Sequence, residues 1–150
     1  MKNDYIIAMI LDYCHLMTPE IYILRIPRYD VERQLYVKHA LYVGIRRDWS
    51  SGTKVLFIRK SESGDDVFIG SGLIHEIVIL DRLAEYEKKL CLENNWYCKL
   101  IFRTITQFHP TVPITSTSAA HDNPHTLHGA IVSTANLAAI EKLVQVRIIS

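Results

Sequence analysis

Positively charged side chains and one tryptophan gather in the second quarter of the chain. The cluster consists of Lys38, His39, Arg46, Arg47, Trp49, Arg59 and Lys60. Guanidinium and ammonium groups neutralise phosphates, and an indole ring is a platform on which an unpaired base can stack. This composition is typical of a surface that binds nucleic acid. The alternative interpretation is that Arg59 and Lys60 lie at the solvent end of a strand and that Trp49 closes one end of a barrel.

Charge is distributed unevenly along the chain, although the net charge of all 150 residues is only +1. Residues 25–60 contain nine Lys and Arg against three acids, a net +6. Residues 61–96 contain three bases and eight acids, a net −5. This segregation predicts a basic face and an acidic face. Two solvated faces of a neutral protein are the alternative.

Three histidines recur at helical spacing near the end of the chain. On a helix, His121, His125 and His128 would share one face and could hold a metal ion with the neighbouring aspartate. Pro124 instead favours a helical turn that begins after His121, which spoils the three-ligand geometry. We therefore expect no metal and no cofactor at this segment.

The cysteines and the hydropathy pattern indicate a cellular compartment. Cys14, Cys91 and Cys98 are odd in number and contain no Cys-x-x-Cys pair, so we expect free thiols in a reducing environment. The apolar run from Tyr5 to Leu11 is too short to span a bilayer and lacks the features of a signal peptide. The expectation is a cytoplasmic protein without a membrane partner.

An amphipathic segment precedes the main domain. Tyr5, Met9, Ile10 and Tyr13 recur at helical spacing, although an apolar strand is a competing interpretation. We expect residues 1–19 to form an extension that packs on a domain of residues 20–150. A homodimer contact through this segment is the alternative to packing on the core.

Short runs of β-branched and aromatic residues predict a sheet. The expected strands are residues 20–26, 54–59, 67–80, 97–106 and 145–149. Gly70 and Gly72 interrupt the third of these, and glycine is the residue that lets a strand bend without losing its pairing. The strand of residues 54–59 and the bent strand of residues 67–80 that follows it suggest a small closed or nearly closed β-barrel.

Helical periodicity predicts three helices around this sheet. They are residues 31–36 after Asp30, residues 81–94 with Leu83, Tyr86 and Leu90 turned inward, and residues 135–144 capped by Ser133 or Thr134. The polar stretch from His109 to His128 is long for a connection without structure. We expect it to be functional or mobile.

The order of these elements carries four recognisable motifs. They are Leu24-Arg25-Ile26-Pro27, Ser51-Gly52-Thr53-Lys54-Val55-Leu56-Phe57, Val67-Phe68-Ile69-Gly70-Ser71-Gly72-Leu73-Ile74 and Val112-Pro113-Ile114-Thr115. This arrangement, from about Ile21 to Val144, is similar to an uncharacterised archaeal family of the PUA-like superfamily, whose relatives include the EVE, ASCH and YTH domains. The resemblance implies an α+β, mixed β pseudobarrel of five or six strands flanked by helices.

The resemblance also implies a function and a candidate set of residues. Relatives bind RNA, or flipped or modified bases in DNA, and the EVE and YTH domains hold the base in an aromatic cage, for which Trp49 is the candidate here. ASCH relatives include small amidohydrolases that use a Lys, a Thr and a Glu. Lys38, Thr115 and Glu76 are therefore an alternative catalytic cleft, in which the lysine would activate the hydroxyl.

These observations favour a non-catalytic nucleic-acid-binding module of a cytoplasmic protein. The expected ligand is RNA or DNA, bound through an extruded or modified base. In this hypothesis Lys38, Arg46 and Arg47 contact phosphates and Trp49 stacks on the base. A small amidohydrolase-like enzyme acting on a modified nucleoside and a protein-interaction domain are the alternatives.

Overall fold

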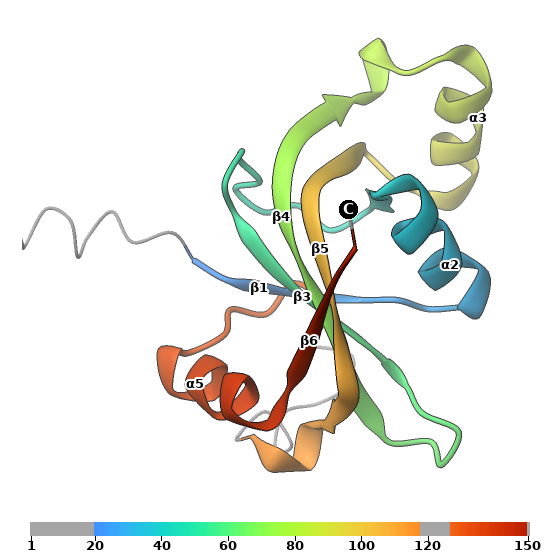
Figure 1. The fold of residues 1–150 in the computed structure, drawn as a ribbon. Helices are drawn as coiled ribbons and strands as arrows, with labels where there is room; N and C mark the ends of the chain where they lie inside the picture. The colour runs from blue at the N-terminus through green and yellow to red at the C-terminus, as the bar shows by residue number, and fades with distance from the viewer. Residues whose placement is uncertain (1–19, 118–126, 150) are drawn as a thin grey trace, which may run out of the picture.

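Two long antiparallel strands, β4 (Asp66–Ile79) and β5 (Cys98–Pro113), organise the fold. The computed structural model describes residues 20–117 and 127–149. Figure 1 shows β4 and β5 curving together, so that the sheet built on them curls into a half-barrel. The predicted α+β class and the curled sheet are confirmed.

The other strands add to this pair on both sides. β3 (Lys54–Lys60) pairs antiparallel with β4, and β1 (Tyr22–Arg25) pairs parallel with β3. β2 (Ala40–Val43) and β6 (Gln145–Ile149) both pair antiparallel with β5. The order β1-β3-β4-β5-β2, with β6 also on β5, is a mixed sheet of six strands in the described ranges. β1 and β2 are therefore the two ends of the curl.

The sheet is packed on both faces. The core inside the curl gathers side chains of β1 and β3 such as Leu24 and Phe57 with Leu35 of helix α2 (Tyr29–Lys38). Neighbouring residues of the same strands, such as Leu56, point to the other face and pack with Ile140 of helix α5 (Thr134–Leu143). Because successive side chains of a strand alternate in direction, β1 and β3 are apolar over most of their length.

Glycines let β5 lie close to the bent strand β4, as predicted. A Cβ atom on Gly70 would overlap the carbonyl oxygen of Thr106, and one on Gly72 would lie 2.8 Å from the ring of Phe102. The register between β4 and β5 also shifts between Phe68 and Gly70. A side chain at either glycine would separate the two strands at the curve.

The helices start at different positions from those predicted. α2 begins at Tyr29, and Asp30 lies in its first turn, where its carboxylate complements the helix dipole, while Arg28 is the N-cap. A 3₁₀ turn (Leu80–Arg82) precedes α3 (Glu85–Asn94), which is capped by Ala84.

The predicted inward face of α3 is wrong for two of its three residues. Leu83 is buried, but Tyr86 is 75% exposed and Leu90 is 40% exposed. The helix packs instead through Cys91 and Glu87. Glu87 is held by two hydrogen bonds from other elements, described below, and this contact rotates the helix away from its apolar stripe.

The second half of the chain follows the prediction in part. The stretch from His109 is not a loop at first, because β5 continues to Pro113 and a 3₁₀ turn (Ile114–Ser116) follows. Ser133 caps α5 by accepting a hydrogen bond from the backbone N–H of Asn136 at 3.1 Å, and the predicted last strand is β6.

Several predictions fall on residues that the structure does not describe. Residues 1–19, with Cys14, the amphipathic stripe and the dimer contact, lie outside the described residues, and so do His121 and His125. Cys91 and Cys98 are buried and free, and burial raises the pKa of both thiols. Among the described helices, none has both the length and the apolar character needed to cross a membrane.

Candidate nucleic-acid interface

The outer edge of β1 is covered by a strap, which we define as residues 127–132. The backbone of Ile23 donates to the carbonyl of Ala130 at 2.8 Å and accepts from Gly129 at 2.6 Å. The N–H of Val132 donates to the carbonyl of Ile21 at 2.7 Å. The strap thus continues the hydrogen bonding of the sheet past β1 without forming a regular strand.

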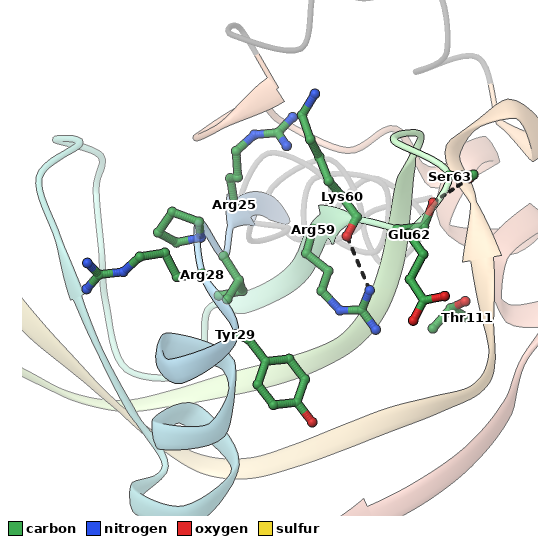
Figure 2. A pocket seen from close by; sticks show the side chains of 11 residues that line it. Arg25, Arg28, Tyr29, Arg59, Lys60, Glu62, Ser63 and Thr111 are labelled. Carbon is green, nitrogen blue, oxygen red and sulfur yellow. Dashed lines mark hydrogen bonds between the residues drawn. The ribbon is translucent and has the colours of Figure 1, made fainter.

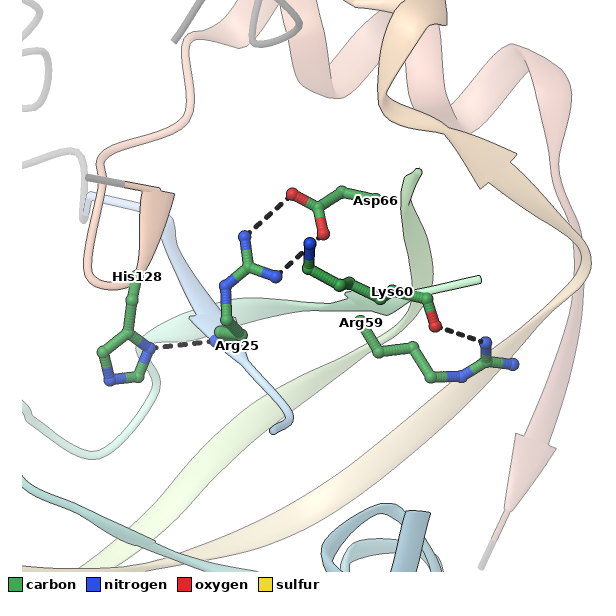
Figure 3. Close-up of polar contacts among 5 residues, drawn as sticks. All are labelled: Arg25, Arg59, Lys60, Asp66 and His128. Atoms are coloured by element: carbon green, nitrogen blue, oxygen red, sulfur yellow. Dashed lines mark hydrogen bonds and ion pairs between the residues drawn. The ribbon is translucent and has the colours of Figure 1, made fainter. Parts of the chain in front are cut away.

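The side chain of His128 continues this series of hydrogen bonds between the strap and β1. The backbone N–H of Arg25 donates to Nδ1 of His128 at 3.0 Å, as Figure 3 shows. Burial, followed by the charges of Arg25 and Arg47, lowers the pKa of His128. The imidazole is therefore neutral near pH 7, and because Nδ1 accepts, its proton is on Nε2.

A groove of about 830 Å³ lies beyond the end of β1. Figure 2 shows the ring of Tyr29, at the start of α2, below the guanidinium of Arg59, at the end of β3, while Arg25 and Lys60 extend upward together and Arg28 points away from them. Tyr29 is 78% exposed, so its ring is available to a ligand. The groove therefore combines basic side chains with one accessible aromatic ring.

Two of the four basic side chains are paired with buried carboxylates. Arg25 donates through both terminal nitrogens to Asp66, at 2.8 Å each, and this pair holds the pKa of the Asp66 carboxyl below its usual range. Nε of Arg59 lies 2.9 Å from Oε2 of Glu32. The two hydrogen bonds to Asp66 fix the position of Arg25, while Nε of Arg59 and Oε2 of Glu32 are close but do not form a hydrogen bond. Both pairs neutralise much of the charge of the groove wall.

The remaining positive charge lies at the rim of the groove. Arg28 forms an ion pair with Asp30, at 3.3 Å, and both side chains are about two-thirds exposed. Lys60 is exposed and makes no ion pair within the described part of the chain. Exposed pairs of this kind contribute little to stability, so both cations remain available to an anionic ligand.

An aromatic pocket of about 280 Å³ lies in the seam between β1 and β2. The apolar part of its lining includes Val31, Leu41 and Val43, and its aromatic part is Tyr42 and Trp96. The rings of Tyr42 and Trp96 are stacked, with centroids 5.3 Å apart and planes 8° from parallel. Arg25, Pro27, Gly44 and His128 complete the pocket.

Tyr42 is held in place from outside the pocket. Its hydroxyl donates to Oε1 of Glu87 at 2.6 Å, and Nζ of Lys99 donates to the same oxygen at 2.7 Å. These hydrogen bonds lower the pKa of Glu87, while burial and the contact with Glu87 raise the pKa of Tyr42. Tyr42 is thus held in place, and the ring of Trp96 stacks on it.

The seven residues predicted to form one basic surface divide into separate groups. Only Arg59 and Lys60 line the groove. Lys38 and His39 lie at the C-terminal end of α2, roughly 14 Å along the helix from its groove end at 1.5 Å per residue. His39 is the left-handed C-cap of that helix, and its N–H donates to the carbonyl of Leu35 at 2.9 Å.

Arg46 and Arg47 lie next to the strap and the aromatic pocket. The guanidinium of Arg46 is 4.6 Å from the ring centroid of Tyr97. Nε of Arg47 donates to the carbonyl of Gly129 at 2.9 Å, so this side chain secures the strap. Both residues are exposed, and neither lines the groove or the aromatic pocket.

Trp49 occupies a structural position. It is half-buried against the inner core, its Nε1 donates to the carbonyl of Ile45 at 3.2 Å, and its ring meets Tyr22 edge to face at 5.1 Å. These contacts hold the indole in place against the core. Trp96 and Tyr42, by contrast, line the aromatic pocket.

The alternative catalytic cleft of Lys38, Glu76 and Thr115 is not formed. Thr115 follows Pro113, which pairs with Val67 near the start of β4. Glu76 lies nine residues further along that curved strand, a path of roughly 30 Å at about 3.3 Å per residue. Because a nucleophile and its base must be within hydrogen-bond reach, these residues cannot share one reaction.

Sequence reasoning missed most of the residues that meet here. The sequence presents Arg25 only as part of the Ile-Pro motif, and His128 only as a possible metal ligand. Tyr42 and Trp96 carry no local signal, since their stacking depends on pairing between β2 and β5. In the part of the chain that the structure describes, no group of three His, Cys, Asp or Glu side chains could hold a metal.

The chain matches no known family, no curated protein and no solved structure at a significant level.

Proposed function

We propose that this protein is a PUA-like module that binds single-stranded RNA, or an extruded base, with the backbone in the basic groove and one base in the aromatic pocket. The observation that carries the proposal is that groove and pocket share Arg25 and Pro27 in their linings. A phosphate at the rim and its neighbouring base can therefore reach both cavities at once.

The groove supplies the contacts that a nucleic-acid backbone requires. Arg28 and Lys60 at the rim can neutralise phosphates, and the exposed ring of Tyr29 can stack on a base that stays outside the pocket. Arg25 and Arg59, held by carboxylates, position the wall. The binding energy would come from few phosphates, so a short binding site is expected.

The pocket supplies the contacts that one unpaired base requires. Its lining is largely apolar, carries a fixed aromatic wall and includes a few polar groups. Proteins that extrude a base hold it in this kind of pocket, between aromatic or apolar side chains and hydrogen-bonding groups. A base within a duplex cannot enter, so single strands should bind more tightly than duplexes.

The fold supports the PUA-like part of the proposal. A mixed, curled sheet, with helix α2 connecting its two end strands, agrees with the pseudobarrel that the resemblance implies. In this proposal the pocket at the seam of the curl, and not Trp49, holds the base.

Fluorescence anisotropy with labelled single-stranded RNA and duplex DNA, at low and physiological salt, tests the proposal. The double variant Arg28→Ala with Lys60→Ala should bind about tenfold more weakly at low salt. The slope of log affinity against log salt should also become shallower, by about 0.7 for each phosphate that the variant no longer neutralises.

The matched control removes the same charge at the other end of β4. Arg82→Ala with Lys89→Ala changes two exposed basic residues of the 3₁₀ turn and α3. This variant should bind RNA as the wild type does. No binding at low salt, or an equal loss in both double variants, would refute the proposal.

A further inference from the structure

The polar side chains of the aromatic pocket have a chemical bias. Arg25, Trp96 and His128 carry hydrogen-bond donors near pH 7, and among the described residues no carboxylate or side-chain amide lines the pocket. The one side-chain oxygen of this lining belongs to Tyr42, and its hydroxyl already donates to Glu87. The side chains of this lining therefore favour a ligand that brings acceptors.

His128 is the most precisely placed of these donors. Its Nδ1 accepts a hydrogen bond from the backbone N–H of Arg25, and a ring nitrogen can accept only when it carries no proton. The neutral ring must therefore carry its proton on Nε2. Figure 3 shows the second ring nitrogen on the side of the imidazole away from Arg25. No hydrogen bond to it is formed by any residue in the described ranges.

The ring has little freedom to turn. It is half-buried, and the strap on which it lies is fixed to β1 by Gly129 and Ala130 and to the β2–β3 connection by Arg47. A donor held in this way before the ligand arrives requires no reordering on binding.

We propose that His128 is the specificity-determining residue of the pocket, and that its Nε2–H selects a base with a carbonyl oxygen at the Watson–Crick edge over a base with an amino group there. This inference rests on the proposed function. A keto group at the 4-position of a pyrimidine or the 6-position of a purine accepts from His128. An amino group at that position would place its N–H against the N–H of His128, so that both donors stay without an acceptor. A polar site rejects the wrong partner in this way.

The backbone of β2 does not cancel this bias. Along an antiparallel strand, the backbone N–H and carbonyl of successive residues point alternately toward and away from the partner strand. The carbonyl of His39 points toward β5, because it accepts from the N–H of Phe102. Tyr42, three residues further on, therefore turns its own N–H and carbonyl away from β5. Tyr42 thus offers the seam one donor and one acceptor. Its carbonyl can receive the imino N–H that lies beside the keto group in uracil and hypoxanthine.

The test uses hexanucleotides that carry one base among tetrahydrofuran abasic spacers, so that every probe has the same charge. The single base is uracil, cytosine, hypoxanthine or adenine, and anisotropy measures affinity for the full-length protein at fixed low salt. We expect the two keto bases to bind roughly tenfold more tightly than their amino counterparts. Replacing uracil by 4-thiouracil, a weaker acceptor, should remove most of the advantage in the unmodified protein.

Two variants assign the preference to His128. In His128→Leu the keto preference should disappear, so that uracil and hypoxanthine bind no more tightly than cytosine and adenine. In His128→Gln, whose amide can accept from Arg25 and still donate, the keto preference should persist.

The outcomes separate the two proposals. If all four probes bind equally in the wild-type protein, the specificity inference is wrong and the proposed function stands. If none binds, both are wrong. A keto preference that survives in His128→Leu would assign the selection to another group. An equal loss of all four probes in that variant would show that His128 supports the pocket wall and does not select the base.

Discussion

The backbone N–H of Arg25 donates to Nδ1 of His128 at 3.0 Å, so a side chain takes the position that a main-chain carbonyl would occupy at the end of the β1 edge. This one contact joins three parts of the molecule. It ties the strap to the sheet, it fixes the imidazole at the wall of the aromatic pocket, and it does so at the residue whose guanidinium binds Asp66 beside the groove.

The contact makes stability depend on pH. Burial, followed by the charges of Arg25 and Arg47, lowers the pKa of His128 below its ordinary value. As the pH falls from about 7.5, the unfolded chain binds a proton on this ring before the folded protein does. The stability that His128 contributes is full above the unfolded pKa and is lost as the pH falls through the folded pKa. Urea unfolding at a series of pH values measures this decline.

His128→Gln should reduce the loss of stability at falling pH, because the glutamine amide does not titrate. His75→Gln is the control, since it changes an exposed histidine of β4 outside this contact. Equal pH dependence in the wild type and in His128→Gln would contradict the assignment.

The ion pair between Arg25 and Asp66 predicts that a small change at Asp66 lowers the free energy of unfolding considerably. Asp66 is 7% exposed and receives both terminal nitrogens of Arg25. Asp66→Asn leaves the guanidinium without its carboxylate and should lower the free energy of unfolding at pH 7 by about 2–3 kcal/mol. Urea denaturation measures the loss.

The neighbouring Asp65→Asn is the matched control. The side chain of Asp65 is exposed, and the change should cost less than about 0.5 kcal/mol. Because the pKa of Asp66 is lowered by Arg25, the difference between the two variants should shrink as the pH falls through the folded pKa of Asp66. A constant difference down to strongly acidic pH would show that the cost does not come from the ion pair.

The two glycines of β4 should differ in their tolerance of a methyl group. In Gly70→Ala the new Cβ meets the backbone carbonyl of Thr106, which cannot move without separating the strands. In Gly72→Ala it meets the rings of Phe102 and Phe57, which can shift by small rotations. We expect about 3 kcal/mol of destabilisation for the first and about 1–2 kcal/mol for the second, measured by thermal or urea unfolding. The reverse order would mean that the curve does not depend on Gly70.

Much of the sheet could be predicted from the sequence because its signals are local. The runs that form β1, β3 and β4 are apolar with turn residues at their ends, and Gly70 and Gly72 mark the curve. The orientation of α3 could not be predicted, because Glu87 is buried by partners that lie on β2 and β5. Periodicity alone places a glutamate in solvent.

The candidate site was predictable only in its chemistry. The sequence predicts that basic and aromatic residues meet, but it groups residues that are close along the chain. Arg25, Tyr42, Trp96 and His128 come together because β1 and β2, the two ends of the curled sheet, lie on either side of one seam. Nothing in a single sequence indicates which strands become the ends.

The two tryptophans provide the sharpest test of which ring binds a base. Trp96 lines the pocket and stacks on Tyr42, so Trp96→Leu should weaken binding of base-containing RNA about tenfold and leave abasic probes unaffected. Trp49 packs on the core and donates to Ile45, so Trp49→Leu should lower the free energy of unfolding by about 2–3 kcal/mol. Its affinity for RNA should be unchanged at temperatures where the variant is folded. Anisotropy with paired probes and urea unfolding on both variants give the answer. Loss of base-dependent binding in Trp49→Leu, with Trp96→Leu unaffected, would return the stacking role to Trp49 and contradict its assignment to the aromatic pocket.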